Sequence, residues 1–379
     1  MNQRQDVRVV MCAPGFPASN DDADKPFLLD HAKALVAHGV SVSVISPAVD
    51  GLPSRQIIDG VNIRRVRYGP RKMETLAATG SMYREARGVK ALLAIPMIVA
   101  LCAAMWVETR KKPVILYGHW WIPGGLVATL VGSIKGCPSV VHLHGSDAMV
   151  TTNRFLKIIA RWVLRNAEIR LAVSDELATW GEELSGRKFD VLPMPLNFGR
   201  LPGPSPVPEQ GFVLAVGRLV PEKGFDVLLK AVGLIESTSR PPVTIIGIGP
   251  ERKNLASQAR RLGVELDLPG AIPPREMSDW YSRCRLVSVP SLREGFGLVA
   301  AEAASAGRAV VASAVGGIPQ VVSHGSSGMH VQPGNVEELA AALQNVDPRW
   351  GVNGPERVAG LGMASHAEIL NQLFDGLLE

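Results

Sequence analysis

Cysteine is scarce in this sequence of 379 residues. The four cysteines are scattered among apolar or small residues and form no Cys-x-x-Cys pair, which excludes a disulfide framework and predicts small buried hydrophobes at Cys12, Cys102, Cys137 and Cys284. The first residues lack the long apolar core and the cleavage site of a signal peptide. Together these features predict a cytoplasmic protein.

Charged residues are also few, at 20% against 46% hydrophobic residues, which excludes a disordered protein. There are 25 basic and 17 acidic residues up to Arg200, and 15 and 18 from Leu201 onward. The basic first half is therefore expected to face an anionic partner. No basic run with interleaved aromatic residues occurs, so a nucleic acid is not the expected partner.

Only one apolar run, at 89–107, approaches the length of about 20 residues that spans a bilayer. Lys90 and Pro96 interrupt this run, and it is flanked by the basic residues Arg84, Arg87, Arg110, Lys111 and Lys112. We expect a buried or interfacial helix here rather than a spanning one. Peripheral contact with an anionic membrane, at its inner face, stays open.

The pattern of elements predicts two α/β domains. Short β-branched runs alternate with helical stretches in both halves, which is typical of parallel sheets with right-handed crossovers. Four prolines and two glycines interrupt the alternation at 200–211 and indicate a hinge. We therefore expect Rossmann-like, doubly wound domains over 1–199 and 212–360 that face each other across a cleft. A final helix over 361–379 is a candidate to cross back to the first domain.

The strongest motif runs from Glu294 to Glu302, between a short strand and a helix of small residues. Gly295 and Gly297 let backbone N–H groups approach a ligand at the helix N-terminus, where free donors and the helix dipole favour a phosphate. Glu302 lies among alanines inside the helix, where its carboxylate can accept hydrogen bonds from a ribose diol. Taken alone, Glu302 would more often be a solvated helix glutamate.

A second motif, GRLVPEKGFDVLLKA at 217–231, directly follows the strand at 212–217. Arg218 and Lys223 lie near the carboxyl end of that strand. Two cations that converge on one point can neutralise a diphosphate leaving group. Taken singly, each would more often be a surface charge.

These motifs together resemble the retaining glycosyltransferases of family 4, which have the GT-B fold of two Rossmann-like domains. The matching pieces follow the family's order over about residues 212–343: the 217–231 motif, GIGPERKNL, the glutamate pair E-x7-E, AGRAVVASAVGGIPQVV and SGMHVQPGNVEELAAAL. The match is looser in the first half, in AKALVAHGVSVSVISP, HWWIPGG and VVHLHGSD.

The resemblance implies a role for each matched residue. Arg218 and Lys223 would hold the donor diphosphate, Glu294 would lie against the donor sugar, and His144 would lie beside the reacting sugar. Further donor contacts are implied for Gly15, Gly217, Ile272, Gly295, Phe296, Gly297, Leu298 and Glu302. No metal or other cofactor is expected, because the Arg and Lys would do what a divalent cation does in metal-dependent transferases.

The sequence departs from the family in two places. Many members have a Gly-Gly pair in the loop after the first strand, where this sequence has only Gly15 and where Lys25 could supply charge instead. Gln320 stands where the later GG-x-P-E stretch has Glu, a position outside the catalytic pair.

Several residues keep two readings. Trp120 and Trp121 could stack on an acceptor sugar or line the core, and Asp147 could bind an acceptor hydroxyl or cap the next helix. His119 and His144 could be metal ligands, but no clustered third ligand is apparent in the sequence, and His142 is expected on the other face of its strand. The Asp-x-Asp at residues 22–24 is expected to be a solvated loop rather than a metal motif.

The sequence thus predicts a retaining hexosyltransferase that uses a nucleoside diphosphate sugar, with UDP as the first candidate base and GDP as the second. The acceptor would be a glycan, as in polysaccharide biosynthesis, a lipid-linked intermediate or a small molecule. The rivals are a sugar-nucleotide epimerase or hydrolase on the same fold and a non-catalytic nucleotide-sugar-binding module.

Overall fold

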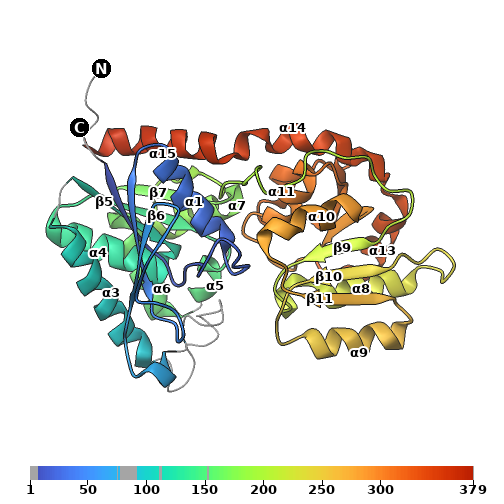
Figure 1. The fold of residues 1–379 in the computed structure, drawn as a ribbon, viewed down its shortest axis with the longest axis horizontal. Coiled ribbons are helices and arrows are strands. Elements are labelled where there is room, and N and C mark those ends of the chain that lie inside the picture. Colours follow the sequence, from blue (N-terminus) through green and yellow to red (C-terminus); the bar gives the residue numbers. More distant parts are fainter. Residues whose placement is uncertain (1–6, 75, 77–91, 111–112, 152, 379) are drawn as a thin grey trace. The chain divides into compact units, whose positions relative to one another are not determined.

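The computed structural model describes residues 7–74, 76, 92–110, 113–151 and 153–378 (Figure 1). The chain divides into unit 1, Met1–Pro195 with Met363–Glu379, and unit 2, Leu196–Gly362. Each unit has its own parallel sheet covered by helices, which confirms the predicted fold class of two Rossmann-like domains.

The sheet of unit 1 has eight strands in the order β3-β4-β2-β1-β5-β6-β7-β8. All neighbours are parallel except β3 and β4. The central strands are buried on both faces, as their continuous apolar sequences predict. The strands are β1 (Arg8–Cys12), β2 (Ser41–Pro47), β3 (Arg55–Ile58), β4 (Val61–Val66), β5 (Val114–His119), β6 (Ser139–Leu143), β7 (Ile169–Ala172) and β8 (Asp190–Val191).

Helices cover both faces of this sheet. Successive residues of β1 point to opposite faces and therefore contribute to two separate cores. Val9 and Met11 share a core with α1 (Pro26–Ala37) and α15 (Met363–Leu378). Val10 and Cys12 share another with α3 (Ala94–Glu108) and α4 (Leu126–Lys135). The remaining helical segments of unit 1 are η1 (Arg71–Met73), η3 (Trp120–Gly125), α5 (Asp147–Val150), α6 (Arg154–Asn166), which packs on α4, and α7 (Asp175–Ser185).

The sheet of unit 2 has six parallel strands in the order β11-β10-β9-β12-β13-β14. The strands are β9 (Val213–Val216), β10 (Val243–Ile246), β11 (Leu266–Gly270), β12 (Leu286–Val289), β13 (Val310–Ser313) and β14 (Gly328–Val331). Between and after them lie η4 (Pro221–Lys223), α8 (Phe225–Leu234), α9 (Arg252–Leu262), η5 (Pro274–Glu276), α10 (Met277–Arg283), α11 (Leu298–Ser305), α12 (Ile318–Val321), α13 (Val336–Asn345), η6 (Pro348–Asn353), α14 (Gly354–Val358) and η7 (Ala359–Leu361).

The segment predicted as a hinge, 200–211, lies inside unit 2, because the observed division falls between Pro195 and Leu196. The buried guanidinium of Arg308 holds this segment by donating to the carbonyl and hydroxyl oxygens of Ser205 at 2.8 and 2.6 Å. Prolines end the regular structure here, but they leave carbonyl oxygens free for such a donor. The second division falls between Gly362 and Met363, and α15 packs on α1 in unit 1.

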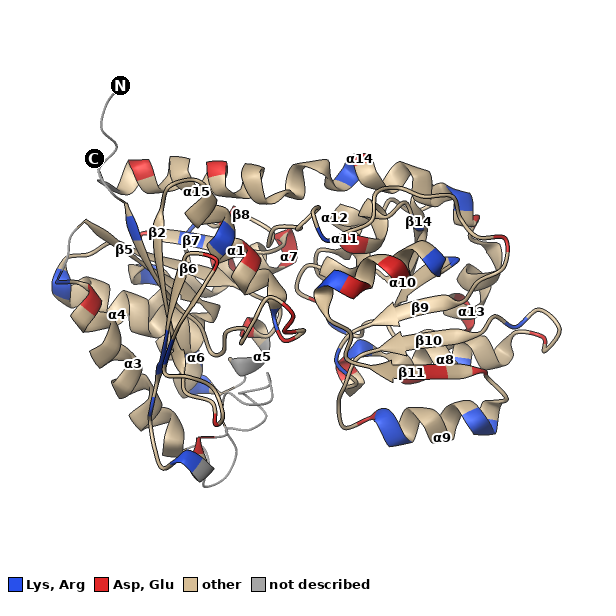
Figure 2. Cartoon of the chain, in the orientation of Figure 1, with Lys and Arg blue, Asp and Glu red and all other residues tan. Residues whose placement is uncertain are grey.

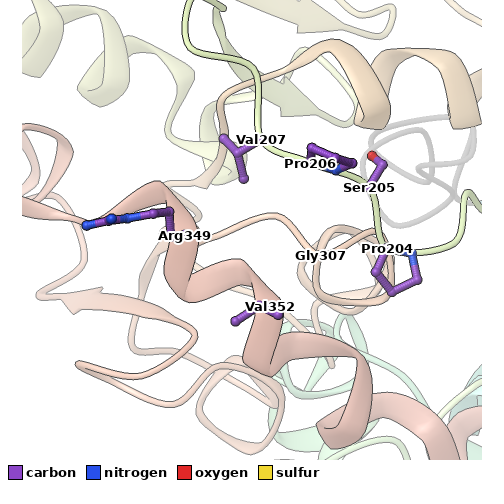
Figure 3. Close-up of a pocket in the computed structure, with 7 residues that line it drawn as sticks. All are labelled: Pro204, Ser205, Pro206, Val207, Gly307, Arg349 and Val352. Atoms are coloured by element: carbon purple, nitrogen blue, oxygen red, sulfur yellow. The ribbon is translucent and has the colours of Figure 1, made fainter.

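A cavity of about 370 Å³ lies beside the same segment in unit 2 (Figure 3). Its only charged lining residue, Arg349, is paired with Asp347 at 2.8 Å. None of the predicted donor-binding residues lines it. The cavity is bordered by Pro204, Ser205, Pro206, Val207, Gly307, Arg349 and Val352.

The apolar run predicted at 89–107 forms α3 from Ala94 onward, and residues 89–91 lie outside the described part of the chain. Within the described ranges, no helix has both the length and the hydropathy needed to cross a bilayer. Cys12, Cys137 and Cys284 are buried, as the sequence predicts, whereas Cys102 is half-buried; all four are free thiols.

Candidate active site

The two strongest sequence motifs meet at one edge of the sheet of unit 2. Strands β9 and β12 are hydrogen-bonded neighbours and run parallel, so the loops after them leave from the same edge. The loop after β9 contains Arg218 and Lys223, and the loop after β12 contains Ser291 and Glu294. Sheet topology thus brings together residues that lie 71 positions apart in the chain.

Glycines allow these loops to pack backbone against backbone. Gly224, with φ of 65°, follows η4, and a Cβ atom there would lie 2.0 Å from the carbonyl oxygen of Pro290. A Cβ atom on Gly316, with φ of 58°, would lie 2.2 Å from the carbonyl oxygen of Glu294. Side chains at either position would displace the loop that holds Glu294.

Lys223 and Glu294 form an ion pair, with 2.6 Å between Nζ and Oε2 and with 22% and 17% of the two side chains exposed. The hydroxyl of Ser291 donates to the same oxygen at 3.2 Å, and the backbone N–H of Gly295 donates to Oε1 at 3.2 Å. The carboxylate is therefore fixed in orientation while one side stays open to a ligand.

These contacts keep Glu294 ionised. Burial alone would raise the pKa of its carboxyl group, but the Lys223 ammonium and the hydrogen bonds from Ser291 and Gly295 outweigh burial and hold the pKa below its usual value. An ionised carboxylate accepts hydrogen bonds from sugar hydroxyls but cannot donate a proton to a leaving group. Glu294 is thus suited to orient a polyol rather than to act as a general acid.

The helix α11 begins at Leu298, directly after Gly297, whose φ is 93°. Its first N–H groups point to the same edge as the Lys223–Glu294 pair, where they favour an anion. One turn into the helix, Glu302 accepts a 2.6 Å hydrogen bond from the hydroxyl of Tyr281 on α10, a fully buried tyrosine. Burial and the neighbouring Glu302 raise the pKa of Tyr281 well above its usual value, so its hydroxyl is a permanent donor.

The other predicted donor residues of unit 2 lie around this edge. Arg218 is exposed at the start of the loop after β9, next to Gly217, and Ile272 is half-buried in the loop after β11. Phe296 is only 6% exposed, so a ligand would meet its backbone rather than its ring. Leu298 is half-buried at the first position of α11.

Unit 1 contains a cluster of five buried histidines, His31, His119, His142, His144 and His366. The predicted site residue His144 directly follows β6, and its Nε2 lies 3.1 Å from Nδ1 of His119. His31 of α1 and His366 of α15 are joined at 2.7 Å between Nδ1 and Nε2. Burial, together with the neighbouring histidines, holds the pKa of His144 well below its usual value, so the ring is neutral.

The structure corrects the expected orientation of His142. Its ring lies 5.0 Å from that of His144, because residues two positions apart along a strand direction point to the same face rather than to opposite faces. A third ring nitrogen thus lies near His119 and His144, within 4.8 Å. Both nitrogens of His142 are already bonded, to the Tyr117 hydroxyl at 2.7 Å and the Leu192 carbonyl at 2.8 Å. These three histidines could hold a metal only by giving up existing hydrogen bonds.

Asp147 forms hydrogen bonds to the segment that contains Trp120 and Trp121. Its carboxylate accepts the backbone N–H of Trp121 at 2.7 Å and that of His144, and its carbonyl accepts the Trp121 indole N–H at 3.1 Å. Burial raises the pKa of Asp147 to about 8, although these backbone donors lower it. Asp147 is the first residue of α5 and does not cap it.

The three residues predicted for the acceptor therefore differ in accessibility. Trp121 and Asp147 are 0% and 1% exposed, so neither offers a surface to a sugar in this structure. Trp120 is half-buried, with its ring 4.3 Å from that of His144, and it is the one of the three that a ligand could reach.

The loop after β1 contains the buried Gly15. Lys25 lies at its end, and its ammonium is paired with Asp24 at 2.5 Å. Asp22 accepts the backbone N–H groups of Ala18 and Asp24 at 2.8 and 2.9 Å. The Asp-x-Asp sequence is thus part of a hydrogen-bonded turn.

Family models cover most of the chain. The model described as "Glycosyl transferase 4-like domain" matches residues 25–196, and the model "Glycosyl transferases group 1" matches residues 203–346. The chain belongs to the family 4-like glycosyltransferases of the GT-B type, as the resemblance of its motifs predicts.

Relatives agree with this family, and solved structures agree with its fold. D-inositol 3-phosphate glycosyltransferase of Nocardioides sp. is 30% identical over 84% of this chain and 76% of its own. Sucrose-phosphate synthase from Thermosynechococcus elongatus superimposes with a TM-score of 0.79 at 20% identity, covering 99% of each chain. Anabaena HepE in complex with UDP and glucose gives 0.75 at 18% identity, covering 98% of this chain and 100% of its own.

The structure adds three supporting residues that the sequence motifs do not include: Ser291, Tyr281 and Arg308. Ser291 lies only three residues before Glu294, so the short spacing in the sequence could have indicated this contact. Tyr281 reaches Glu302 from another helix, and Arg308 reaches the proline-rich segment across 103 residues. No spacing rule in the sequence indicates either of these contacts.

Proposed function

We propose that the chain transfers a hexose from a nucleoside diphosphate sugar to an acceptor hydroxyl, with retention of the anomeric configuration and without a metal ion. UDP is the proposed nucleotide and GDP the second candidate. The observation that supports this most strongly is the Lys223–Glu294 pair at the edge of β9 and β12, beside the N-terminus of α11.

The charges of this site suit a departing diphosphate. The Lys223 ammonium is balanced by Glu294 and becomes available to phosphate oxygens when they displace that contact. Arg218 on the same loop and the first N–H groups of α11 supply further donors. Such preorganised donors stabilise negative charge as the sugar–phosphate bond breaks, which is the role a divalent cation has elsewhere.

The two glutamates would hold the neutral parts of the donor. Glu294, kept ionised, would accept hydrogen bonds from hydroxyls of the hexose. Glu302, oriented by Tyr281, would accept them from the ribose diol. Neutral His144 would lie beside the reacting sugar, as the family resemblance implies.

The similar proteins support a nucleotide sugar as the donor, and they are compatible with several classes of acceptor. The HepE structures contain UDP, UDP-glucose, or UDP with glucose. Several relatives act on D-inositol 3-phosphate by name, an anionic small molecule that would suit the basic first half of this chain. Glycans and lipid-linked intermediates are the other proposed acceptors.

A transfer assay with EDTA present tests the proposal. UDP- and GDP-sugars would be incubated with D-inositol 3-phosphate, with oligosaccharides and with a polyprenyl phosphate sugar, and nucleotide release and product anomer would be followed by NMR. We expect acceptor-dependent release of UDP and a product with the donor's anomeric configuration. Glu302→Gln should raise the donor KM, whereas Glu356→Gln, an exposed control on α14, should not.

The rivals give other outcomes in the same assay. Free sugar or an epimer formed without any acceptor would indicate a hydrolase or epimerase. Loss of all activity in EDTA with recovery in Mg²⁺ would contradict the metal-free mechanism. Nucleotide binding without turnover on any acceptor of the panel would favour a non-catalytic binding module.

A further inference from the structure

Three helices of unit 1 lie side by side on one face of its sheet (Figure 1). The helix α3 packs on α4, and α4 packs on α6. The side chains that α3 and α4 bury share a core with Val10 and Cys12 of β1, so the opposite sides of these helices point away from the sheet.

The outward sides of these helices are rich in large apolar residues. On α3 the exposed positions recur every three or four residues, so they form one stripe along the helix. On α6, Phe155, Ile158 and Trp162 repeat the pattern. We call this surface the apolar face; its large exposed residues are Ile95, Val99, Trp106, Val107, Leu130, Ile134, Phe155, Ile158 and Trp162.

Basic residues accompany the apolar face. The sequence of α6 has no acidic residue, and its four basic residues, Arg154, Lys157, Arg161 and Arg165, are all exposed. The ammonium of Lys135 on α4 lies 3.5 Å above the ring of Trp106. The one acidic residue of the three helices, Glu108, is paired with Arg8 at 3.0 Å. In Figure 2 most of α3 and α4 is tan, the colour of uncharged residues, and α6 carries blue, the colour of lysine and arginine.

We propose that the apolar face docks on an anionic lipid surface, with α3 and α6 parallel to the membrane plane. Apolar side chains would enter the headgroup region while the arginines and lysines contact lipid phosphates. The 15 residues of α3 are too few to span a bilayer, but a helix of any length can lie in the interface. Trp106 and Trp162 are the residue type that such interfaces favour.

Charge favours a lipid surface over a second copy of the chain. Two copies paired through this face would bring the four basic residues of one α6 toward those of another, without acidic residues on these helices to balance them. An anionic membrane would balance them. The proposal does not depend on the proposed glycosyl transfer, since it rests on side chains outside the candidate active site.

Vesicle sedimentation with the full chain tests this surface. Phosphatidylcholine vesicles with and without phosphatidylglycerol would be used at low salt, and we expect binding to the anionic vesicles that weakens as salt is added. Since each basic residue near such a surface contributes about 1 kcal/mol, Lys157→Glu with Arg161→Glu should lower the partition coefficient at least roughly tenfold. Phe155→Ser with Ile158→Ser should lower it as well.

Matched controls lie elsewhere on the molecule. Lys253→Glu with Arg260→Glu makes the same charge change on α9, and Ile57→Ser with Val352→Ser removes side chains that are 70% and 73% exposed. These variants should bind vesicles like the unmodified chain, and all variants should keep its melting temperature.

Two results would overturn the proposal. One is equal binding of the α6 variants and the α9 controls, or no preference for anionic vesicles. The other is a dimer in sedimentation velocity without lipid that the α6 variants dissociate, which would assign the face to a second copy.

Discussion

The two units share an α/β architecture with mainly parallel sheets, but their predicted site residues lie in opposite kinds of polar environment. In unit 2, Lys223 and Glu294 form an ion pair in the loops after β9 and β12, and both side chains are partly exposed. Unit 1 buries neutral histidines against one another on and directly after β5 and β6, and Asp147 accepts the backbone N–H groups of Trp121 and His144. The Lys223 ammonium can therefore exchange Glu294 for an anionic ligand, whereas the neutral, buried histidines can only hold neighbouring side chains in place.

Removing the cation of unit 2 should have the largest effect. Lys223→Ala takes away the proposed donor to the leaving diphosphate and leaves Glu294 without its counter-charge, so we expect kcat to fall about 10²- to 10³-fold. Steady-state kinetics with a UDP-sugar checks this. The control is Lys230→Ala, which removes an exposed lysine paired with Asp226 on α8. Similar losses in both variants would contradict the assigned role.

Acid should destabilise unit 1 before it breaks the ion pair of unit 2. Burial lowers the pKa of His366 from its usual 6.5 to about 4, so the unfolded chain binds this proton more readily than the folded chain. The resulting stability is complete above about pH 6.5 and is lost as the pH falls toward 4. At about 1.4 kcal/mol per pH unit, His366 alone would cost about 3 kcal/mol.

Denaturant unfolding at about pH 7 and about pH 4.5 measures this loss. His366→Gln should flatten the pH dependence, and His324→Gln, which changes an exposed histidine of unit 2, should not. The pKa of Glu294 is below its usual value, so the stability from the ion pair is lost only at lower pH. An unchanged slope in His366→Gln would mean that the cluster is not neutral as described.

The smallest effect is expected from Tyr281→Phe. The hydroxyl of Tyr281 only orients Glu302, and water can replace part of its hydrogen bond, so a loss of about 1 kcal/mol should raise the donor KM roughly fivefold at unchanged kcat. Tyr68→Phe, a buried tyrosine of unit 1 that bonds the backbone N–H of Leu76, is the control. A fall in kcat without a change in KM would contradict a positioning role.

The parts that the sequence predicts best are local. A glycine or charge directly after a short apolar strand must lie at the edge of a parallel sheet, so Lys223, Glu294 and the start of α11 could be found without a structure. The order of the strands in the sheet could not be predicted in this way. That order makes β9 and β12 neighbours and so brings Lys223 and Glu294 into contact.

The remaining features depend on distant contacts. His31 and His366 meet across 335 residues, and nothing near either one indicates the other. The proline-rich segment has the same composition whether it is a free hinge or is held by Arg308. The uniform apolar sequence of α3 likewise gives no sign of which side it exposes, because periodicity is lost when both sides are hydrophobic.

The binding of UDP in the presence of EDTA, measured by isothermal titration calorimetry, tests the central claim most directly. We predict binding to the unmodified chain without metal, weakened in both Lys223→Ala and Glu302→Gln but not in Glu356→Gln. Binding that requires Mg²⁺, or that is equal in all four proteins, would contradict the claim that these residues of unit 2 hold the nucleotide.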